Sequence, residues 1–269
     1  MKAEGGGTKE MLEAAAGKRL WVEKIYPAWL PLVLAMGLVW RRRWWRFLVG
    51  GLNRPVLFLL LFAWNFKENT AGVHYLHFLV PGLVVMAAVT ASYSDLVNWF
   101  TLRRTFYRVL DEYLLAPLGT RSLLAGHLIA GGGKGVLMAL LVYLAAWVIV
   151  GGFKLSLFFV VQLAVIAFTF AALAVAVAMV ARGDKDVLMF TNALVFPLTF
   201  FCGTFFPVER LPGVFTKVSW FLPLTAGTYN LRSLALQGAN HWSWFLQSLG
   251  WLGALYLLAY LLLEWRRQD

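Results

Sequence analysis

Few residues of this chain could carry out chemistry, and most of them lie inside or beside long apolar runs. His74 and His77 are three residues apart, so they could share a helix face and bind a metal ion, but no third ligand lies nearby in the sequence. An interfacial location explains the two histidines better. The chain has no HExxH or CxxC motif and no spacing that supports a Ser-His-Asp arrangement. We therefore expect no catalytic residues and no metal site.

A glycine-rich run at residues 131–135 has some likeness to a nucleotide-binding loop. That loop requires G-x-x-x-x-G-K-[S/T], whereas here Leu128 occupies the first glycine position and Gly135 follows Lys134. Small residues in an apolar segment favour close packing of helices instead. We expect this chain to bind no cofactor, and Lys134 either to snorkel to the cytoplasmic surface or to line a cavity.

Other charged residues in apolar surroundings have two interpretations each. Asp95 is either a proton or ion site, or a residue that caps its helix or pairs with Arg103 or Arg104. The second interpretation is favoured because Asp95 lies within two turns of the basic end of its helix. Glu209 and Arg210 either form a local salt bridge, which is the simpler interpretation, or contact a substrate.

One stretch, Val187–Gly238, has an unusual pattern. Its first part, Val187–Phe206, is apolar and has about the ~20 residues that cross a bilayer, but Pro197 interrupts it. The rest holds too many prolines and glycines for a simple helix and is too apolar for a simple external loop. We predict a spanning helix followed by a segment that re-enters the membrane or lies in its interface, where protein or a water-filled cavity must satisfy the broken backbone. The candidate pathway and gate residues are Pro197, Phe201, Gly203, Phe206, Pro207, Leu211, Pro212, Pro223, Thr225 and Arg232.

Composition places the chain in a membrane. Hydrophobic residues make up 61% and charged residues 14% of the 269 residues, and the mean hydropathy is +0.70, whereas a soluble domain is about a quarter charged. The net charge of +11 comes from basic residues that flank apolar segments, so topology and anionic lipid explain it better than nucleic acid. The single cysteine, Cys202, is expected to be a small buried core residue rather than a reactive thiol.

We expect an all-α, polytopic membrane protein with six transmembrane helices, an N-terminal interfacial amphipathic helix and a re-entrant or gate segment between the fifth and sixth spans. Arg54 would be costly in hydrocarbon, by about 2.5–3.5 kcal/mol, so either Arg54 snorkels or the first span breaks at Asn53-Arg54-Pro55. The polar stretch Lys67–His77 is expected to be a short external loop. The predicted spans are residues 47–66, 78–100, 122–150, 155–181, 187–206 and 245–263.

The predicted spans divide the chain into two regions. Residues 1–46 form a cytoplasmic tail and the interfacial helix, and residues 47–269 form a single transmembrane domain. Arginine and tryptophan are interleaved at the end of the first region, which suits a helix on the cytoplasmic leaflet; nucleic-acid binding is the weaker alternative. The predicted anchor residues are Arg41, Arg42, Arg43, Trp44, Trp45 and Arg46.

Basic residues are unevenly divided between the two sides of the predicted bundle. Six spans place both termini on one side, and most of the basic residues fall on that side. The positive-inside rule then makes both termini cytoplasmic, in a multi-pass protein of the cytoplasmic (inner) membrane. The basic residues expected on the other side are Lys67, Lys154, Arg210, Lys217 and Arg232.

Two ordered patterns resemble a known family. They are Phe200–Pro207, Leu211-Pro212, Leu222–Thr225 and Arg232, and earlier Tyr75, Phe78, Pro81 and Gly82. Both are similar to the permease subunits of ABC-2 type (type-2) exporters, which include NodJ-like nodulation-factor, polysaccharide and drug export subunits. The resemblance implies short re-entrant or periplasmic gate helices after the fifth span and an amphipathic helix before the first.

The resemblance also assigns a role to the charged loop Arg103–Leu124. In this family such a loop forms a coupling helix that docks in a cleft of the ATPase subunit and transmits its motion; the alternative is a solvated loop that only connects helices. The implied coupling residues are Arg103, Arg104, Arg108, Asp111, Glu112, Tyr113 and Pro117.

Two classes of function remain open. The first, which the resemblance implies, is the permease subunit of an exporter. It would form a homodimer, or a pair with a second, different permease, in membrane lipid, with two copies of a separate ATP-binding cassette subunit that carries ATP and Mg. The aromatic density around the predicted gate suits an amphipathic, lipid-linked or glycan-type substrate. The second is a membrane-embedded enzyme or an assembly subunit without transport activity.

Overall fold

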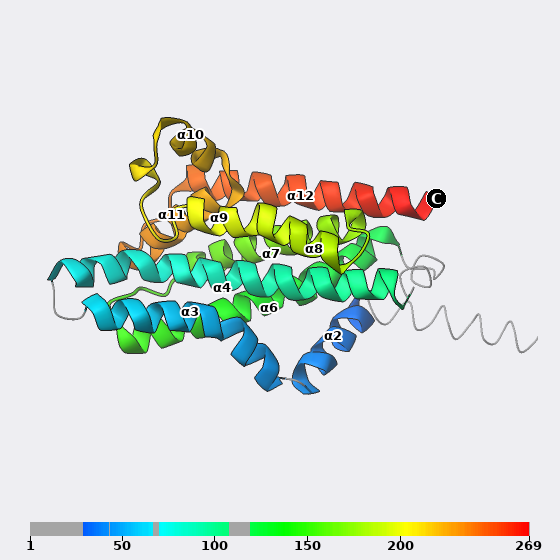
Figure 1. Cartoon of the computed structure of the whole chain (residues 1–269), viewed down its shortest axis with the longest axis horizontal. Helices are drawn as coiled ribbons and strands as arrows, with labels where there is room; N and C mark the ends of the chain where they lie inside the picture. Colours follow the sequence, from blue (N-terminus) through cyan, green and yellow to red (C-terminus); the bar gives the residue numbers. More distant parts are fainter. Residues whose placement is uncertain (1–28, 43, 67–69, 108–118, 269) are drawn as a thin grey trace, which may run out of the picture.

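The computed structural model describes residues 29–42, 44–66, 70–107 and 119–268. All regular elements in these ranges are helices, most of which run side by side in one bundle (Figure 1), so the all-α prediction is confirmed for this part of the chain. In chain order the elements are α2 (Leu30–Arg42), α3 (Trp44–Phe66), α4 (Thr70–Thr105), α6 (Thr120–Ile149), α7 (Leu157–Val180), α8 (Asp184–Phe190), η1 (Thr191–Val195), α9 (Phe196–Phe201), η2 (Val208–Arg210), α10 (Gly213–Phe221), α11 (Pro223–Leu236) and α12 (Trp242–Gln268).

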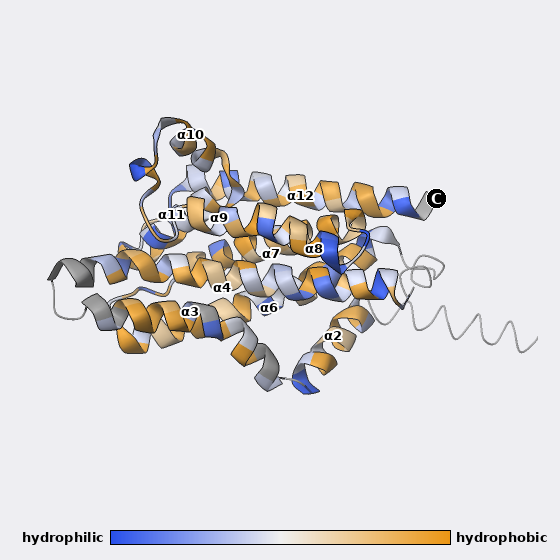
Figure 2. Cartoon of the chain, viewed as in Figure 1, coloured by the Kyte–Doolittle hydropathy of each residue, from blue (hydrophilic) through white to orange (hydrophobic). Residues whose placement is uncertain are grey.

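Four helices are long and apolar enough to cross a membrane, and they match the second, third, fourth and sixth predicted spans. Figure 2 shows strongly hydrophilic residues mainly at the helix ends and in the turns. The first predicted span lies in α3, whose apolar part, Leu48–Phe62, is shorter. The fifth is divided among α8, η1 and α9, so no single regular helix continues through it. The four candidate spans are Tyr75–Thr105, Thr120–Ile149, Leu157–Val180 and Trp242–Arg266.

The core of the bundle is formed by α4, α6 and α7, in which small residues allow close approach. A Cβ atom on Gly135 of α6 would lie 2.9 Å from the carbonyl oxygen of Ala88 in α4 and 3.1 Å from the Cβ of Ala167 in α7. Both distances are shorter than ordinary van der Waals contact, so a larger residue would push the helices apart. The prediction that this glycine run serves helix packing is confirmed.

The helix α3 runs without a break through Asn53-Arg54-Pro55. Proline removes one backbone hydrogen bond but need not end a helix when its neighbours support it. The alternative of a broken first span is therefore wrong. The predicted loop Lys67–His77 is shorter than expected, because α4 already begins at Thr70.

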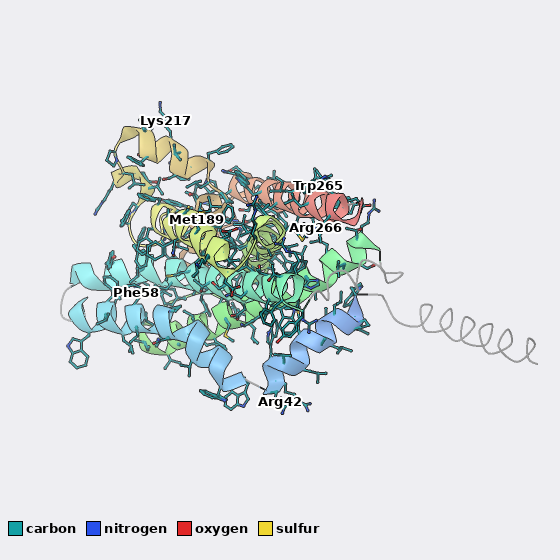
Figure 3. All side chains as sticks on the ribbon, turned by 45° about the vertical axis from the view of Figure 1, so that its right-hand side comes forward. Arg42, Phe58, Met189, Lys217, Trp265 and Arg266 are labelled. Atoms are coloured by element: carbon teal, nitrogen blue, oxygen red, sulfur yellow. The ribbon has the colours of Figure 1, made fainter. Side chains whose placement is uncertain are left out.

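The two ends of the bundle carry different elements. At the right of Figure 1, α4 and α12 end and α6 begins, whereas α10 and α11 lie at the opposite end. In Figure 3, Arg266 marks the first end, Lys217 lies on α10, and Arg42 lies at the outer end of α2. The segments predicted to couple and to gate are therefore attached to opposite ends of the bundle.

One arginine ties two helices together at the first end. Arg104 of α4 donates hydrogen bonds to the backbone carbonyl oxygens of Met179 and Ala181 at the end of α7. The last carbonyl groups of a helix have no partner within it, and a cation there also complements the helix dipole. The guanidinium group of Arg104 is thus engaged in holding α4 against α7.

Candidate functional site

The fifth predicted span is assembled from three short pieces. The helix α8 passes into a π-helical turn, η1, and α9 follows with Pro197 near its start. Proline has no backbone N–H, and just before Pro197 the α-helical bonding gives way to a wider π turn, whereas α3 continues regularly through Pro55. The interruption predicted at Pro197 is therefore present as a π turn, a feature frequently found at functional sites.

A groove of about 400 Å³ lies between α3, α4 and the η1–α9 segment. Three of the side chains that line it are aromatic: Phe58 of α3, and Phe196 and Phe200 of α9. The ring centres of Phe196 and Phe200 are 4.8 Å apart. None of the described lining residues carries a charge. The groove is lined by Leu57, Phe58, Leu61, Met86, Thr90, Ser94, Thr191, Val195, Phe196, Thr199 and Phe200.

Hydroxyl groups supply the polarity of the groove. The hydroxyls of Thr90, Thr191 and Thr199 each donate to a backbone carbonyl three or four residues earlier, at 2.7–2.8 Å. Their protons are thereby used, and the oxygen lone pairs remain as acceptors. Sequence analysis missed these residues, although Thr90 and Ser94 stand four apart in an apolar helix, a spacing that places both on one face.

After α9 the chain turns sharply over residues 202–207 and packs against α4. Gly203 has a φ of +78°, a conformation that favours glycine. A side chain there would lie 2.7 Å from the ring of Tyr229. On the facing helix, a Cβ on Gly82 would collide with the backbone carbonyl of Thr204. Both glycines are required because the turn lies this close to its neighbours.

Two side chains hold this turn to α4. Arg232 of α11 donates from Nη2 to the carbonyl oxygen of Gly203 at 2.7 Å and from Nε to that of Phe78 at 3.1 Å. Its guanidinium carbon lies 3.6 Å from the centre of the Phe78 ring, a cation–π contact. The hydroxyl of Tyr75 donates to the carbonyl oxygen of Phe205 at 3.0 Å. The turn, α4 and α11 are therefore joined at Arg232.

Arg232 stays positively charged in its buried environment, but one of its hydrogen-bond donor groups has no acceptor among the described residues. The side chain is only 8% exposed, and burial lowers the pKa of Arg232 to about 10, so that it remains charged near neutral pH. Its Nη1 group is buried and has no hydrogen-bond partner among the residues that the structure describes. An unpaired buried donor is costly, so the observed position of the turn leaves one polar group unsatisfied.

The carboxylate of Glu209 accepts a hydrogen bond from a tyrosine. The Tyr229 hydroxyl donates to Glu209 Oε2 at 2.9 Å and accepts from the backbone N–H of Val208 at 2.9 Å. Burial raises the pKa of Tyr229 to about 12, so the hydroxyl keeps the proton that it donates. The predicted salt bridge to Arg210 is wrong, because consecutive residues of a 3₁₀ turn project about 120° apart.

On its other side α11 is held by a chain of buried amides. Asn230 donates to the side-chain oxygens of Gln162 in α7, at 2.9 Å, and of Asn240, at 3.0 Å. Gln162 in turn donates to Ser248 of α12 at 3.2 Å. The Asn230 oxygen accepts from the backbone N–H of His241 at 2.9 Å. Hydrogen bonds are strong in a low-dielectric interior, so these bonds fix α11 to α7 and α12, although the buried Nδ2 of Asn240 has no partner among the described residues.

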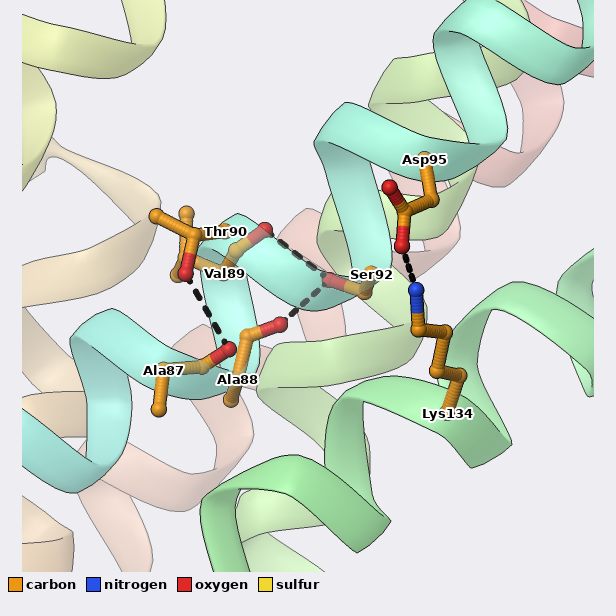
Figure 4. Close-up of polar contacts among 7 residues, drawn as sticks. All are labelled: Ala87, Ala88, Val89, Thr90, Ser92, Asp95 and Lys134. Carbon is orange, nitrogen blue, oxygen red and sulfur yellow. Dashed lines mark hydrogen bonds and ion pairs between the residues drawn. The ribbon is translucent and has the colours of Figure 1, made fainter. Parts of the chain in front are cut away.

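An ion pair with one buried partner joins α4 to α6 outside the groove. Lys134 pairs with Asp95 (Figure 4), and the lysine side chain is 3% exposed whereas that of the aspartate is 44% exposed. The prediction that Asp95 pairs with Arg103 or Arg104 is therefore wrong. The lysine comes within reach because the glycines beside it let α6 approach α4.

The predicted gate residues do not form one cluster. Gly203 and Arg232 are in direct contact, and the ring of Phe201 stacks on that of Phe215 in α10, with the ring centres 6.0 Å apart. Pro223 is the first residue of α11, a position that suits proline because its missing N–H has no partner there. The others lie along the connecting turns and the start of α11: Phe206, Pro207, Leu211, Pro212 and Thr225.

The predicted anchor and coupling residues are only partly described. Arg41 and Arg42 end α2, and exposed Trp44 and Trp45 begin α3. Arg103 lies near the end of α4, with its guanidinium 4.0 Å from the ring centre of Trp99. The residues outside the described part are Arg43, the side chain of Arg46, and Arg108, Asp111, Glu112, Tyr113 and Pro117.

Within the described residues, no group of three or more His, Cys, Asp or Glu side chains lies close enough to hold a metal ion. The ring of His77 packs against that of Phe153, with the centres 5.3 Å apart. The side chain of His74 lies outside the described part. Cys202 is fully buried, as predicted.

Comparisons with known proteins give one matching family model and several similar proteins. A family model described as "ABC-2 type transporter" matches residues 32–236. The chain is 26% identical over 198 residues to the inner membrane transport permease YadH of Escherichia coli K12, covering 68% of this chain and 73% of that protein. It is 30% identical over 238 residues to nodulation protein J of Rhizobium meliloti strain 1021, covering 79% and 86%. It is 29% identical over 219 residues to nodulation protein J of Rhizobium leguminosarum bv. trifolii, covering 74% and 80%.

Proposed function

The chain belongs to the ABC-2 type transporter family, and we propose that it is the permease subunit of an ATP-driven exporter for an amphipathic, lipid-linked or glycan-type substrate. Its relatives are named as an inner membrane transport permease and as nodulation proteins. The observation that carries the proposal is the groove between α3, α4 and the η1–α9 segment.

The chemistry of the groove fits a sugar-bearing substrate. Its threonine hydroxyls have spent their protons on backbone carbonyls, so they present acceptors. Its aromatic walls present flat apolar faces. A glycan combines hydroxyl donors with apolar C–H faces and so matches both. Because no described lining residue is charged, a neutral glycan or lipid portion fits the groove better than an ionic one.

The η1 turn supports a water-filled path beside the groove. Asn192 lies on this turn and is exposed. A polar side chain facing hydrocarbon is unfavourable, and such residues usually face a bundle interior or an aqueous cavity. We assign this face to a path between two copies of the chain, because closed two-fold pairing is the commonest way for identical subunits to assemble.

The turn at residues 202–207 and α11 would form the outer gate of that path. Arg232 and Tyr75 hold the turn against α4, and α11 is held by the amide chain at Asn230. Opening the path requires the first set of contacts to break while the second keeps α11 in place.

The energy would come from a separate ATP-binding cassette subunit, two copies for each pair of permeases. The loop Arg103–Leu118 would transmit its motion, and Arg104 would pass that motion to the end of α7 through its carbonyl contacts. This role requires the termini and the loop to be cytoplasmic, which the distribution of basic residues favours.

A co-purification experiment tests the proposal. The charge reversals Asp111→Lys and Glu112→Lys, made together, are expected to abolish ATPase association and substrate-dependent ATP turnover. The control, Asp184→Lys with Glu264→Lys, makes the same change in net charge elsewhere and is expected to retain both. Failure of any ATPase to associate with the unaltered chain in gentle detergent would remove the energy source and contradict the proposal.

A further inference from the structure

A cleft beside the Asp95–Lys134 pair is separate from the groove. It has a volume of about 210 Å³ and lies between α2, α4 and α6. This is below the ~300–1,000 Å³ of sites that enclose a whole drug-sized ligand, so the cleft has room for a headgroup rather than a complete substrate. We call it the α2 cleft; its walls include Met36, Val39, Trp40, Asp95, Asn98 and Trp99.

The α2 cleft contains a negatively charged hydrogen-bond acceptor, the carboxylate of Asp95. One oxygen of Asp95, Oδ2, pairs with Lys134 (Figure 4). The aspartate side chain remains 44% exposed. A carboxylate has about four lone-pair sites, so it can accept further hydrogen bonds from a group in the cleft. Lys134 also lines the cleft, but its side chain is only 3% exposed and its ammonium group pairs with Asp95. A donor or cation is therefore the ligand group that this end of the cleft favours.

The same face of α4 carries a positive charge two turns away. Asp95, Trp99 and Arg103 are spaced four residues apart, so they follow one another along one helix face. The guanidinium of Arg103 lies over the ring of Trp99. A ligand along this face would meet the Asp95 carboxylate first and Arg103 next.

The surroundings of α2 indicate that the ligand is a lipid. Leu34 and Leu38 of this helix are 55% and 61% exposed, an arrangement that suits contact with acyl chains. Apart from its few polar groups, the cleft is walled by apolar and aromatic side chains such as Met36. An amphiphile with adjacent cationic and anionic groups on an apolar body matches these features.

We propose that the α2 cleft binds the headgroup of an aminophospholipid such as phosphatidylethanolamine, with its primary ammonium at Asp95 and its phosphate towards Arg103. A quaternary choline group cannot donate to the carboxylate, and it binds best to aromatic faces. Here Lys134 already lies over the ring of Trp40 and Arg103 over that of Trp99. The cleft therefore selects a primary ammonium. This inference does not depend on the transport proposal.

The test compares lipids that differ only in the headgroup. Delipidated protein in detergent is incubated with phosphatidylethanolamine, its mono- and dimethylated forms, phosphatidylcholine or phosphatidylglycerol, all with the same acyl chains, and the bound lipid is counted by native mass spectrometry. Phosphatidylethanolamine is expected to bind at least about tenfold more tightly than phosphatidylcholine, with affinity falling at each methylation. Equal binding of these two lipids, or tighter binding of phosphatidylglycerol, would overturn the proposal.

Variants separate the carboxylate from its role in the ion pair. Asp95→Asn is expected to abolish the preference for phosphatidylethanolamine, and the control Asp184→Asn, at another exposed aspartate, is expected to retain it. The exchange of Asp95→Lys with Lys134→Asp keeps an ion pair but places a lysine at the cleft, so it is also expected to lose the preference. If the exchanged chain keeps the preference, Asp95 is not the acceptor. If Asp95→Asn does not fold, the methylation series on the unaltered chain decides.

Discussion

The close packing of α6 against α4 and α7 leads to a quantitative prediction about Gly135. Replacing it with alanine places a Cβ against the Ala88 carbonyl in α4 and the Ala167 side chain in α7. Overpacking of this kind costs about 1–3 kcal/mol. Gly133 is the matched control, because nothing lies within 4 Å of its Cβ position. Both substitutions gain the same helix propensity, about 0.8–1.0 kcal/mol, so the stability difference between the two variants is the overpacking cost.

The assay measures the thermal unfolding of the detergent-solubilised variants. Samples are heated to a series of temperatures, and size-exclusion chromatography then measures how much folded protein remains. For a chain of this size each kcal/mol shifts Tm by about 2–4 °C. Gly135→Ala is therefore expected to melt about 2–12 °C below Gly133→Ala, with the latter equal to or above the unaltered chain. Equal melting of the two variants would show that α4, α6 and α7 are not in close contact at this glycine.

Four further predictions concern the turn and the groove. Arg232→Met is expected to lower stability by about 1.5–3 kcal/mol for each charged hydrogen bond lost, measured by the same melting assay; recovery by Arg232→Lys to the full level would argue against the bidentate contact. Tyr75→Phe should cost only about 1 kcal/mol, and a larger loss would mean that the Tyr75 hydroxyl does more than bond one carbonyl. Asn192→Cys should react with a charged, membrane-impermeant maleimide while Leu257→Cys, exposed on α12, should not; reaction at both or neither would contradict the aqueous path. Native Cys202 is fully buried and should be labelled only after denaturation, which a mass shift would report.

Much of the helical framework follows from the sequence because a long apolar run has few alternatives in a membrane. The runs that became α4, α6, α7 and α12 were located within a few residues for this reason. The fifth predicted span is not among the four candidate spans; helical elements there end at Phe201, and the π turn within them was not predicted. A length rule counts apolar residues, whereas the π turn at Thr191–Val195 depends on how the backbone adapts to Pro197.

The site was predictable only where local backbone chemistry determines it. Gly203 was singled out by its pattern and does adopt a positive φ against Tyr229. The partner of Asp95 was not predictable, because nearby arginines are the natural choice in the sequence while Lys134 arrives through the packing of α6. The hydroxyls of the groove were missed for a related reason: a threonine in an apolar helix looks ordinary until the neighbouring helices enclose it.

The core and the turn are held by different kinds of contact, and this difference determines which part of the chain can move. In the core, backbones meet without spare volume, and any shift of α6 against α4 and α7 must compress several atoms at once. The turn at residues 202–210 is held instead by the side chains of Arg232, Tyr75 and Tyr229. At about 0.5–1.5 kcal/mol for a neutral hydrogen bond and about 1.5–3 kcal/mol for a charged one, these three contacts, one neutral and two charged, sum to about 3.5–7.5 kcal/mol. Reversing a two-state equilibrium from 1:99 to 99:1 takes about 5.5 kcal/mol. The free energy that holds the turn is thus small enough for a partner's binding energy to overcome while the core stays intact. The proposed exporter requires this combination of a movable turn and a rigid core.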